Sequence, residues 1–350
     1  MSMADCSPLS AFYGYESKTI AFKWTADGDV LLDVLAPKVK TGKSVTVLLH
    51  YHGGFLVIGN RYAFLPYWLV NACVTRGWVF VTPDYRLLPE STAHDTLEDA
   101  LEAYTWVLKS LPSIIGTDIE SVVLARSSAG AYLALTTATR LTERPSALLL
   151  IYGMLDATQY RYTTAGANIF GRPAIETASV LAQFPLATEQ SQRRTISTHP
   201  LSKDLAVDPR SELIAALHVD ALFPDYMAGI AGMTESIARY GIDTIPKDHQ
   251  ILFPLAFSKL SNVPTTILLH GRSDSAVPVS QSEVASEKLS AAGVTVHTVF
   301  PDDAEHGFDA RAGNVNVEAI DCQSVASFRS LRKVLKLLDA AVEKKSQALR

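Results

Sequence analysis

The sequence predicts an α/β protein whose central sheet is mostly parallel and flanked by helices. Short apolar runs rich in β-branched residues alternate with segments of helical spacing along most of the 350 residues. Such alternation is typical of parallel strands joined by helical crossovers. Hydrophobic residues make up 48% of the chain and charged residues 19%, which suits a large folded core. Several polar residues also follow expected strands, where open α/β sheets bind ligands.

The first part of the chain supports this class element by element. Thr19–Phe22 and Val30–Leu35 are expected strands that flank a turn-forming Ala-Asp-Gly. Val45–His50 is a short apolar run and predicts a buried strand. The elements expected next are a helix over Leu65–Arg76, a strand over Trp78–Thr82, a helix over Thr96–Leu111, a strand over Val122–Ala125, a helix over Ala129–Leu141 and a strand over Ala147–Tyr152.

The alternation stops between residues 156 and 259. Helical pieces at Ile175–Gln183, Ser211–Leu222 and Met233–Tyr240 are separated by prolines, and no strong strand pattern occurs. A structureless loop of this length is improbable in a compact domain. We therefore expect a mainly helical cap, 156–259, inserted between the strands near Tyr152 and Thr265, with residues 1–155 and 260–350 as the core. The elements expected after it are a strand over Thr265–His270, a helix over Gln281–Ala291, a strand over Val294–Phe300 and a long helix over Ser324–Val342.

Charge and composition exclude several classes of function. The net charge of −5 provides no basic field for nucleic acid or an anionic membrane surface. No window approaches the roughly 18 apolar residues of a membrane span, and the N-terminus shows no secretory signal, so we expect a cytoplasmic protein. Cys6, Cys73 and Cys322 are too widely spaced for a zinc knuckle or a disulfide framework. We expect no metal and no organic cofactor.

Two adjacent glycines directly follow the strand that ends at His50. Gly53 and Gly54 allow a backbone turn to present N–H groups without side chains in the way. Such N–H groups can stabilise a developing oxyanion. A plain glycine turn, or metal binding by His50 and His52, remains an alternative, although no third metal ligand is apparent. The residues beside the turn that we expect to contact a substrate are Tyr51, Phe55 and Asn60.

A candidate nucleophile lies where an expected strand meets a helix of small residues. Ser128 has Gly130 two positions after it, as a sharp strand-to-helix turn requires. Two positions before it stands Arg126 instead of glycine, so the G-x-S-x-G pattern is broken. Ser127 has Ala125 two positions before it and Ala129 two positions after it, so it also remains a candidate for the acting serine. A serine that only caps the following helix is a further alternative. We expect Arg126 and Ser127 to contact the substrate.

Two further candidates follow later strands. Asp274 comes after the strand over Thr265–His270, and a carboxylate there can orient a histidine. His306 follows the strand over Val294–Phe300 and can act as a general base. Each residue alone could be an ordinary turn aspartate or loop histidine. Together with Ser128, however, they give the chain order serine, aspartate, histidine, which distinguishes one serine hydrolase fold from others.

Five segments also carry a family resemblance. On them the chain resembles the hormone-sensitive-lipase-like, HGG-motif branch of the α/β-hydrolase superfamily. The resemblance covers about residues 45–152 and 263–340 and leaves out the middle insertion. The five segments are His52-Gly53-Gly54-Phe55, Asp84 to Glu90, Leu97-Glu98-Asp99-Ala100, Ser128-Ala129-Gly130 and His306-Gly307-Phe308.

The resemblance implies an α/β-hydrolase fold and a role for each matching residue. It implies Ser128 as the nucleophile, His306 as base and then acid, and Asp274 as the residue that orients His306. It favours Ser128 over Ser127 through the Ser-Ala-Gly match. The backbone N–H groups that it implies for the oxyanion hole belong to Gly53, Gly54 and Ala129.

These observations favour a carboxylic ester hydrolase that works through an acyl-enzyme. A second hypothesis is a biosynthetic enzyme of secondary metabolism that uses the same three residues to hydrolyse a thioester or to transfer or cyclise an acyl group. A third is a non-catalytic small-molecule binder on the same fold. The insertion is rich in aromatic residues, most of which we expect to bury it against the sheet; the others would suit a bulky, apolar ester or thioester substrate.

Overall fold

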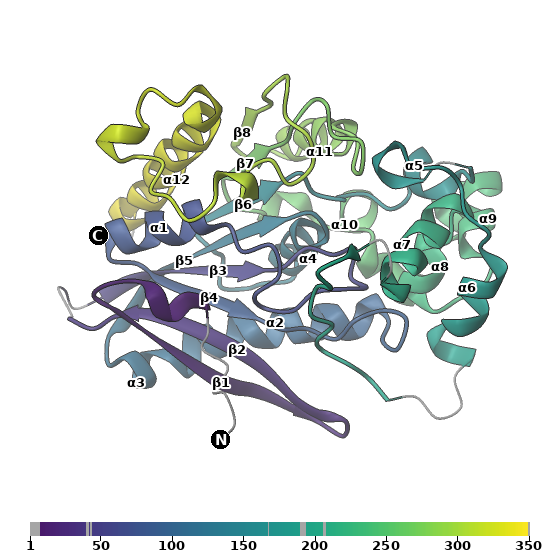
Figure 1. Ribbon diagram of the computed structural model, residues 1–350, viewed down its shortest axis with the longest axis horizontal. Coiled ribbons are helices and arrows are strands. Elements are labelled where there is room, and N and C mark those ends of the chain that lie inside the picture. The colour runs from purple at the N-terminus through teal and green to yellow at the C-terminus, as the bar shows by residue number, and fades with distance from the viewer. Residues whose placement is uncertain are drawn as a thin grey trace.

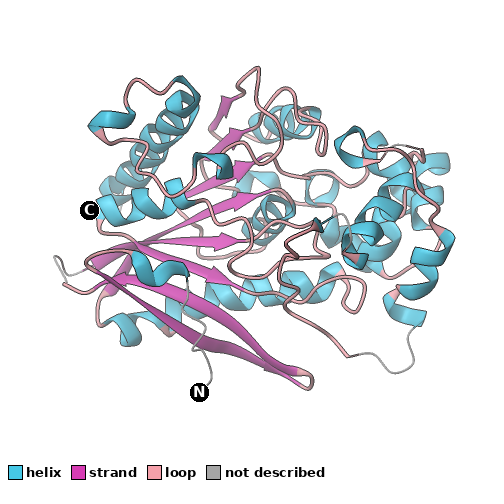
Figure 2. Ribbon diagram, in the orientation of Figure 1, coloured by secondary structure: helices cyan, strands magenta, loops and turns pink. Residues whose placement is uncertain are grey.

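An eight-stranded sheet forms the middle layer of the computed structural model, which describes residues 8–39, 42, 44–166, 168–189, 194–205 and 208–348 (Figures 1 and 2). The strand order is β1-β2-β4-β3-β5-β6-β7-β8. Only the β1–β2 and β2–β4 pairs of this sheet are antiparallel, which confirms the mostly parallel sheet. The strands are β1 (Tyr15–Thr25), β2 (Gly28–Pro37), β3 (Ser44–Tyr51), β4 (Val79–Pro83), β5 (Asp118–Ser127), β6 (Ala147–Ile151), β7 (Thr266–Leu269) and β8 (Val296–Val299).

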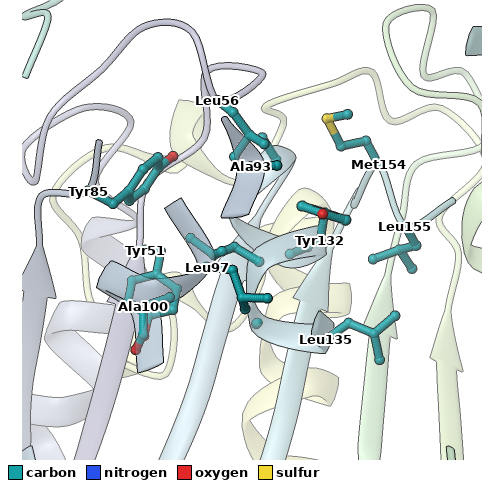
Figure 3. Close-up of a cluster of buried hydrophobic side chains, with 14 of the residues drawn as sticks. Tyr51, Leu56, Tyr85, Ala93, Leu97, Ala100, Tyr132, Leu135, Met154 and Leu155 are labelled. Atoms are coloured by element: carbon teal, nitrogen blue, oxygen red, sulfur yellow. The ribbon is translucent and has the colours of Figure 1, made fainter. Parts of the chain in front are cut away.

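Helices cover both faces of the sheet. Successive strand residues point to opposite faces, so that Leu124 packs under α2, α4 and α11 while Val123 packs under α1 and α12. Figure 3 shows side chains of β3, α2 and α4 meeting on the first of these faces. The last helix begins at Arg329, five residues later than expected, because a 3₁₀ turn at Ala326–Phe328 precedes it. The helices are α1 (Tyr67–Arg76), α2 (Ala93–Lys109), α3 (Leu111–Ile115), α4 (Ala129–Ala138), α11 (Ser280–Ala291) and α12 (Arg329–Ala348).

The described parts of the segment between β6 and β7 contain short helices joined by loops, and no strand. Figure 1 shows its helices beside the ends at which the parallel strands point. Buried Arg210 ties α7 to the core: its guanidinium donates to the carbonyl oxygens of Val57 and Leu88 and pairs with Glu90. The helices of the segment are α5 (Tyr160–Thr163), α6 (Ala178–Gln183), α7 (Pro209–Val219), α8 (Phe223–Ala228), α9 (Met233–Tyr240) and α10 (Pro254–Phe257).

The structure bears on two predictions for the whole chain, which concern membrane-spanning helices and the state of the cysteines. Across the described ranges, no helix combines the length and the apolar character that crossing a bilayer requires. Cys73 and Cys322 are free thiols, and Cys6 lies outside the described residues.

Candidate active site

Ser128 lies at the turn between β5 and α4. Its φ of 54° and ψ of −124° are strained for a residue with a side chain, and such strain concentrates at functional sites. Gly130 is required next to it, because a Cβ there would lie 2.4 Å from the carbonyl oxygen of Tyr51 and 2.8 Å from that of His52. The start of α4 therefore packs directly against the end of β3.

Ser128, His306 and Asp274 form one chain of hydrogen bonds. The Nε2 atom of His306 lies 3.2 Å from the Oγ atom of Ser128. Its Nδ1 atom lies 2.7 Å from Oδ2 of Asp274. These distances are those over which a histidine can take a proton from a serine hydroxyl while a carboxylate orients the ring.

The carboxylate of Asp274 is nearly buried and has four hydrogen-bond donors around it. Its Oδ1 accepts the backbone N–H groups of Ala276 and Val277, at 2.9 and 2.8 Å. Burial alone would raise its pKa, but the hydrogen bonds from His270 and His306 outweigh burial and lower the pKa to about 2. Asp274 therefore remains ionised over the whole neutral range.

His270 is a second histidine at Asp274, and sequence reasoning gave it no role. Its Nε2 atom lies 3.2 Å from Oδ2 of Asp274 and 2.9 Å from the carbonyl oxygen of Val277. Its Nδ1 atom lies 2.8 Å from the hydroxyl of Ser282. His270 ends the strand run that located Asp274, so its position in the sequence was already a signal.

The glycine turn lies against the candidate nucleophile. A Cβ added to Gly53 would be 3.2 Å from the Cβ of Ser128, and Gly54 adopts a φ of 106° that side chains rarely allow. Ala129 is the first residue of α4, where a helix leaves backbone N–H groups without helical partners. Gly53, Gly54 and Ala129, the residues expected to supply the oxyanion donors, therefore lie close to Ser128.

A cavity of about 190 Å³ opens at Ser128 and His306. Its walls come from the glycine turn, from the segment between β6 and β7, and from the loop that carries His306. Two of the residues predicted to contact a substrate, Phe55 and Ser127, line it, whereas Tyr51, Asn60 and Arg126 do not. Its apolar side chains are Phe55, Ile58, Phe64, Ile169, Phe170, Leu205, Ile214, Ala215 and Ala310.

Arg126 and Tyr51 lie on the face of the sheet that is covered by α2 and α4. Arg126 points away from the cavity because strand side chains alternate between faces. Its guanidinium carbon lies 3.3 Å from the centroid of the Tyr51 ring, and none of its three nitrogens has a hydrogen-bond partner among the described residues. Burial lowers the pKa of Arg126. Asn60 instead accepts a hydrogen bond from the backbone of Tyr62, at 3.0 Å.

His50 and His52 have different surroundings. The His50 ring stacks on Phe80, and the His52 ring stacks on Tyr85, because β3 ends at Tyr51 and the chain then turns. Burial lowers the pKa of His52 to about 3. The described residues include no group of three metal-ligating side chains.

Tyr152 and Asp309 are parts of the site that sequence reasoning missed. The Tyr152 ring lies 4.5 Å from the His306 ring, between centroids, and its hydroxyl donates to Asp309. Asp309 also accepts the indole N–H of Trp68, at 2.9 Å. Burial raises the pKa of Asp309, while these donors oppose the rise. Tyr152 ended an expected strand, but nothing in the sequence pairs it with Asp309.

A model of an alpha/beta hydrolase fold family matches residues 48–227. The match spans more than half of the chain, and the chain therefore belongs to this family, which contains the hormone-sensitive-lipase-like esterases. The predicted resemblance is confirmed.

Two kinds of curated relative are similar to the chain. One is the non-reducing polyketide synthase atr1 of Stereocaulon alpinum, 29% identical over 311 residues, which cover 80% of this chain and 12% of the synthase. The other is the probable carboxylesterase M8 of a Phoma species, 24% identical over 319 residues, which cover 86% of this chain and 92% of M8. The chain thus spans about one eighth of the length of the synthases that it matches.

Solved structures of esterases share the fold. Carboxyl esterase 2 of Tuber melanosporum superimposes with a TM-score of 0.58 at 18% identity, over 98% of this chain and 89% of the esterase. A bacterial heroin esterase gives a TM-score of 0.60 at 18% identity, over 98% of this chain and 87% of that enzyme. The predicted α/β-hydrolase fold is confirmed.

Proposed function

We propose that the protein is a serine hydrolase that cleaves carboxylic esters through an acyl-enzyme. The observation that carries the proposal is the hydrogen-bonded chain from Ser128 through His306 to Asp274, which opens into an apolar cavity beside a glycine turn. The similarity to the probable carboxylesterase M8 and to esterases of known structure supports the same chemistry.

The geometry supports a two-step reaction. Ser128 Oγ attacks the ester carbonyl carbon while its proton moves to Nε2 of His306. The N–H groups of Gly53, Gly54 and Ala129 would hold the oxyanion, which collapses as His306 protonates the leaving alcohol. Water, deprotonated by His306, then attacks the acyl-enzyme, and the acid leaves as the Oγ–carbonyl bond breaks and His306 returns the proton to Oγ of Ser128. Asp274 stays ionised and stabilises the imidazolium in both steps.

In this proposal the insertion, 156–259, serves as a cap over the core formed by 1–155 and 260–350. It supplies part of the cavity wall, including Ile169, Phe170 and Ile214. The cavity, about 190 Å³, is little larger than the roughly 150 Å³ cavity that holds benzene in an engineered protein. The group inside it is therefore apolar and about the size of one substituted ring, more compact than the bulky group the aromatic content of the insertion suggests.

A second candidate is hydrolysis or transfer of a thioester-bound acyl group. It is favoured by the similarity to segments of non-reducing polyketide synthases, such as prhL of Penicillium brasilianum, at 28% identity over 83% of this chain. A synthase that assembles an acyl chain needs a step that releases it, and a serine acyl-enzyme can perform that step.

Labelling with a fluorophosphonate, followed by peptide mass spectrometry, tests the proposal. We expect modification of Ser128, retained in Ser127→Ala and lost in His306→Ala. Modification of Ser127 instead would keep the hydrolase and change the nucleophile. A folded protein that is not labelled would contradict the proposal and favour a non-catalytic binder. Comparing turnover of an oxygen ester with that of the matching thioester, and free acid with cyclised product, then separates the two candidates.

A further inference from the structure

Two phenylalanines stand exposed at the mouth of the cavity. Phe64 is 40% exposed and Phe170 is 42% exposed, although both line the same cavity as Ser128. They come from distant parts of the chain, one from the loop before α1 and the other from the segment between β6 and β7. Exposed apolar side chains grouped at the rim of a cavity are typical of ligand-binding surfaces.

The backbone at both positions is held in a conformation that bulky residues avoid. The φ angle is 53° at Phe64 and 56° at Phe170. Such outliers persist where the surrounding structure fixes them, and they cluster at ligand-binding sites. The backbone N–H of Phe170 also donates to the carbonyl oxygen of Ser275, at 3.2 Å, in the turn that follows Asp274. The backbone at Phe170 is therefore tied to the core beside Asp274.

Arg172 gives this apolar mouth a positive charge. Its exposed side chain lines the cavity, and its guanidinium carbon lies 5.8 Å from the centroid of the Phe170 ring. The described residues that line the cavity include no aspartate or glutamate. When a guanidinium lies over an aromatic ring, its N–H groups point outward in the guanidinium plane. Two of these N–H groups can then donate side by side to the two oxygens of a carboxylate.

The position of Phe170 indicates which part of the substrate this mouth would meet. Its ring centroid lies 6.1 Å from that of His306, which in the proposed mechanism protonates the leaving group. The acyl group would occupy the inner cavity, and the leaving alcohol would emerge past His306 toward Phe170.

We propose that Phe64, Phe170 and Arg172 form a leaving-group subsite for an aromatic ring that carries a carboxylate. This inference rests on the proposed ester hydrolysis and names the substrate class for it, the aryl ester of a hydroxylated aromatic acid. The two phenyl rings contact the aromatic ring of the alcohol, and Arg172 pairs with its carboxylate.

The kinetic test compares two leaving groups of nearly equal shape. We expect kcat/KM to be about tenfold higher for 3-carboxyphenyl acetate than for 3-carbamoylphenyl acetate, mainly through KM. Arg172→Gln should remove that preference, so that the ratio of kcat/KM for the two esters falls to about one. Arg239→Gln is the matched control, because Arg239 is also exposed and stacks on an exposed ring, Tyr240, outside the cavity. It should keep the preference.

A binding measurement keeps the test independent of turnover. In Ser128→Ala, calorimetry should show tighter binding of the carboxyphenyl ester than of the carbamoyl ester, and adding Arg172→Gln should remove the difference. Equal binding of the two esters in Ser128→Ala overturns the subsite. Acetyl coenzyme A that binds more tightly than either ester, through Arg172, overturns it in favour of a phosphate-bearing thiol. If no ester is cleaved, the proposed hydrolysis fails, while calorimetry still decides the subsite.

Discussion

Two buried polar clusters lie on either side of Ser127, and they differ in whether their polar groups have partners. Toward the cavity, Asp274 faces His306 and His270, and the ring nitrogens of both histidines have hydrogen-bond partners. Toward α2 and α4, the guanidinium of Arg126 lies over the ring of Tyr51 and has no hydrogen-bond partner among the residues that the structure describes. The chain joins the two clusters at the end of β5, where Arg126 belongs to one and Ser128, two residues later, contacts His306 of the other.

The contrast shows that burial stabilises a charge only when its partners are in place. Four donors around Asp274 more than offset the burial of its charge, as its lowered pKa indicates. A buried guanidinium without a carboxylate loses several kcal/mol of hydration, and a cation–π contact returns only about 2 kcal/mol. We therefore expect Arg126 to destabilise the fold, whereas the cluster at Asp274 stabilises a charge that the proposed reaction uses.

The largest expected effect comes from removing the charge of the partnered cluster. Asp274→Asn should lower kcat by about 10⁴-fold, because an amide neither stabilises the imidazolium nor selects the tautomer of His306 that accepts a proton from Ser128. Steady-state kinetics on a short-chain aryl ester measures this. Ser282→Ala, which removes only the support of His270, is the control and should stay within tenfold of the original activity. A comparable loss in Ser282→Ala would mean that His270 acts in the reaction.

The cluster without partners should respond in the opposite direction. Arg126→Met replaces the guanidinium with an apolar side chain and should raise the free energy of unfolding by about 1–4 kcal/mol, with labelling of Ser128 retained. Urea denaturation at pH 7 measures the change. Arg126→Lys, which keeps the charge but not the flat contact with Tyr51, should be less stable than the original protein. A destabilised Arg126→Met would show that the guanidinium has partners that offset its burial.

The smallest expected effect is a difference between the two clusters in how pH changes their contribution to the free energy of unfolding. The pKa of Asp274 is lower in the folded protein than in the unfolded chain, so its ionised carboxylate adds about 2 kcal/mol to the free energy of unfolding. This contribution is complete above the unfolded pKa near 4 and is lost as pH falls toward about 2. The stability difference between the protein and Asp274→Asn should therefore narrow between pH 5 and pH 2. The effect of Arg126→Met should not change over that range, because a guanidinium stays protonated. Urea unfolding at both pH values checks this, and a constant Asp274→Asn difference would contradict the lowered pKa.

The fold could be predicted because its signal is periodic and local. The apolar runs Val45–His50 and Thr265–His270 each predict a buried strand without reference to the rest of the chain. The structure has β3 and β7 at these positions. The resemblance then placed Ser128, Asp274 and His306 in one site, although the sequence alone gives no distance between positions 128 and 306.

The parts that could not be predicted depend on which way a side chain points. Arg126 and Tyr51 are adjacent in sequence to Ser128 and to the glycine turn, which predicts that they contact the substrate. Both belong to strands, however, and the alternation of strand side chains directs them to the face covered by α2 and α4. The link from Tyr152 to Asp309 joins residues 157 positions apart and has no sequence pattern. The unpartnered state of Arg126 likewise follows only from the packing around it.

The attachment of α7 has a mechanical consequence for ligand entry. Arg210 fastens the start of α7 to two core carbonyl oxygens and to Glu90, so the cavity wall that includes Ile214 is anchored. The opposite wall is held as well: Ile169 is buried in the hydrophobic core, and the backbone N–H of Phe170 donates to the carbonyl oxygen of Ser275. Because both walls are attached to the core, we expect the cavity to select ligands by size, with any larger substituent left outside at the exposed rim formed by Phe64 and Phe170.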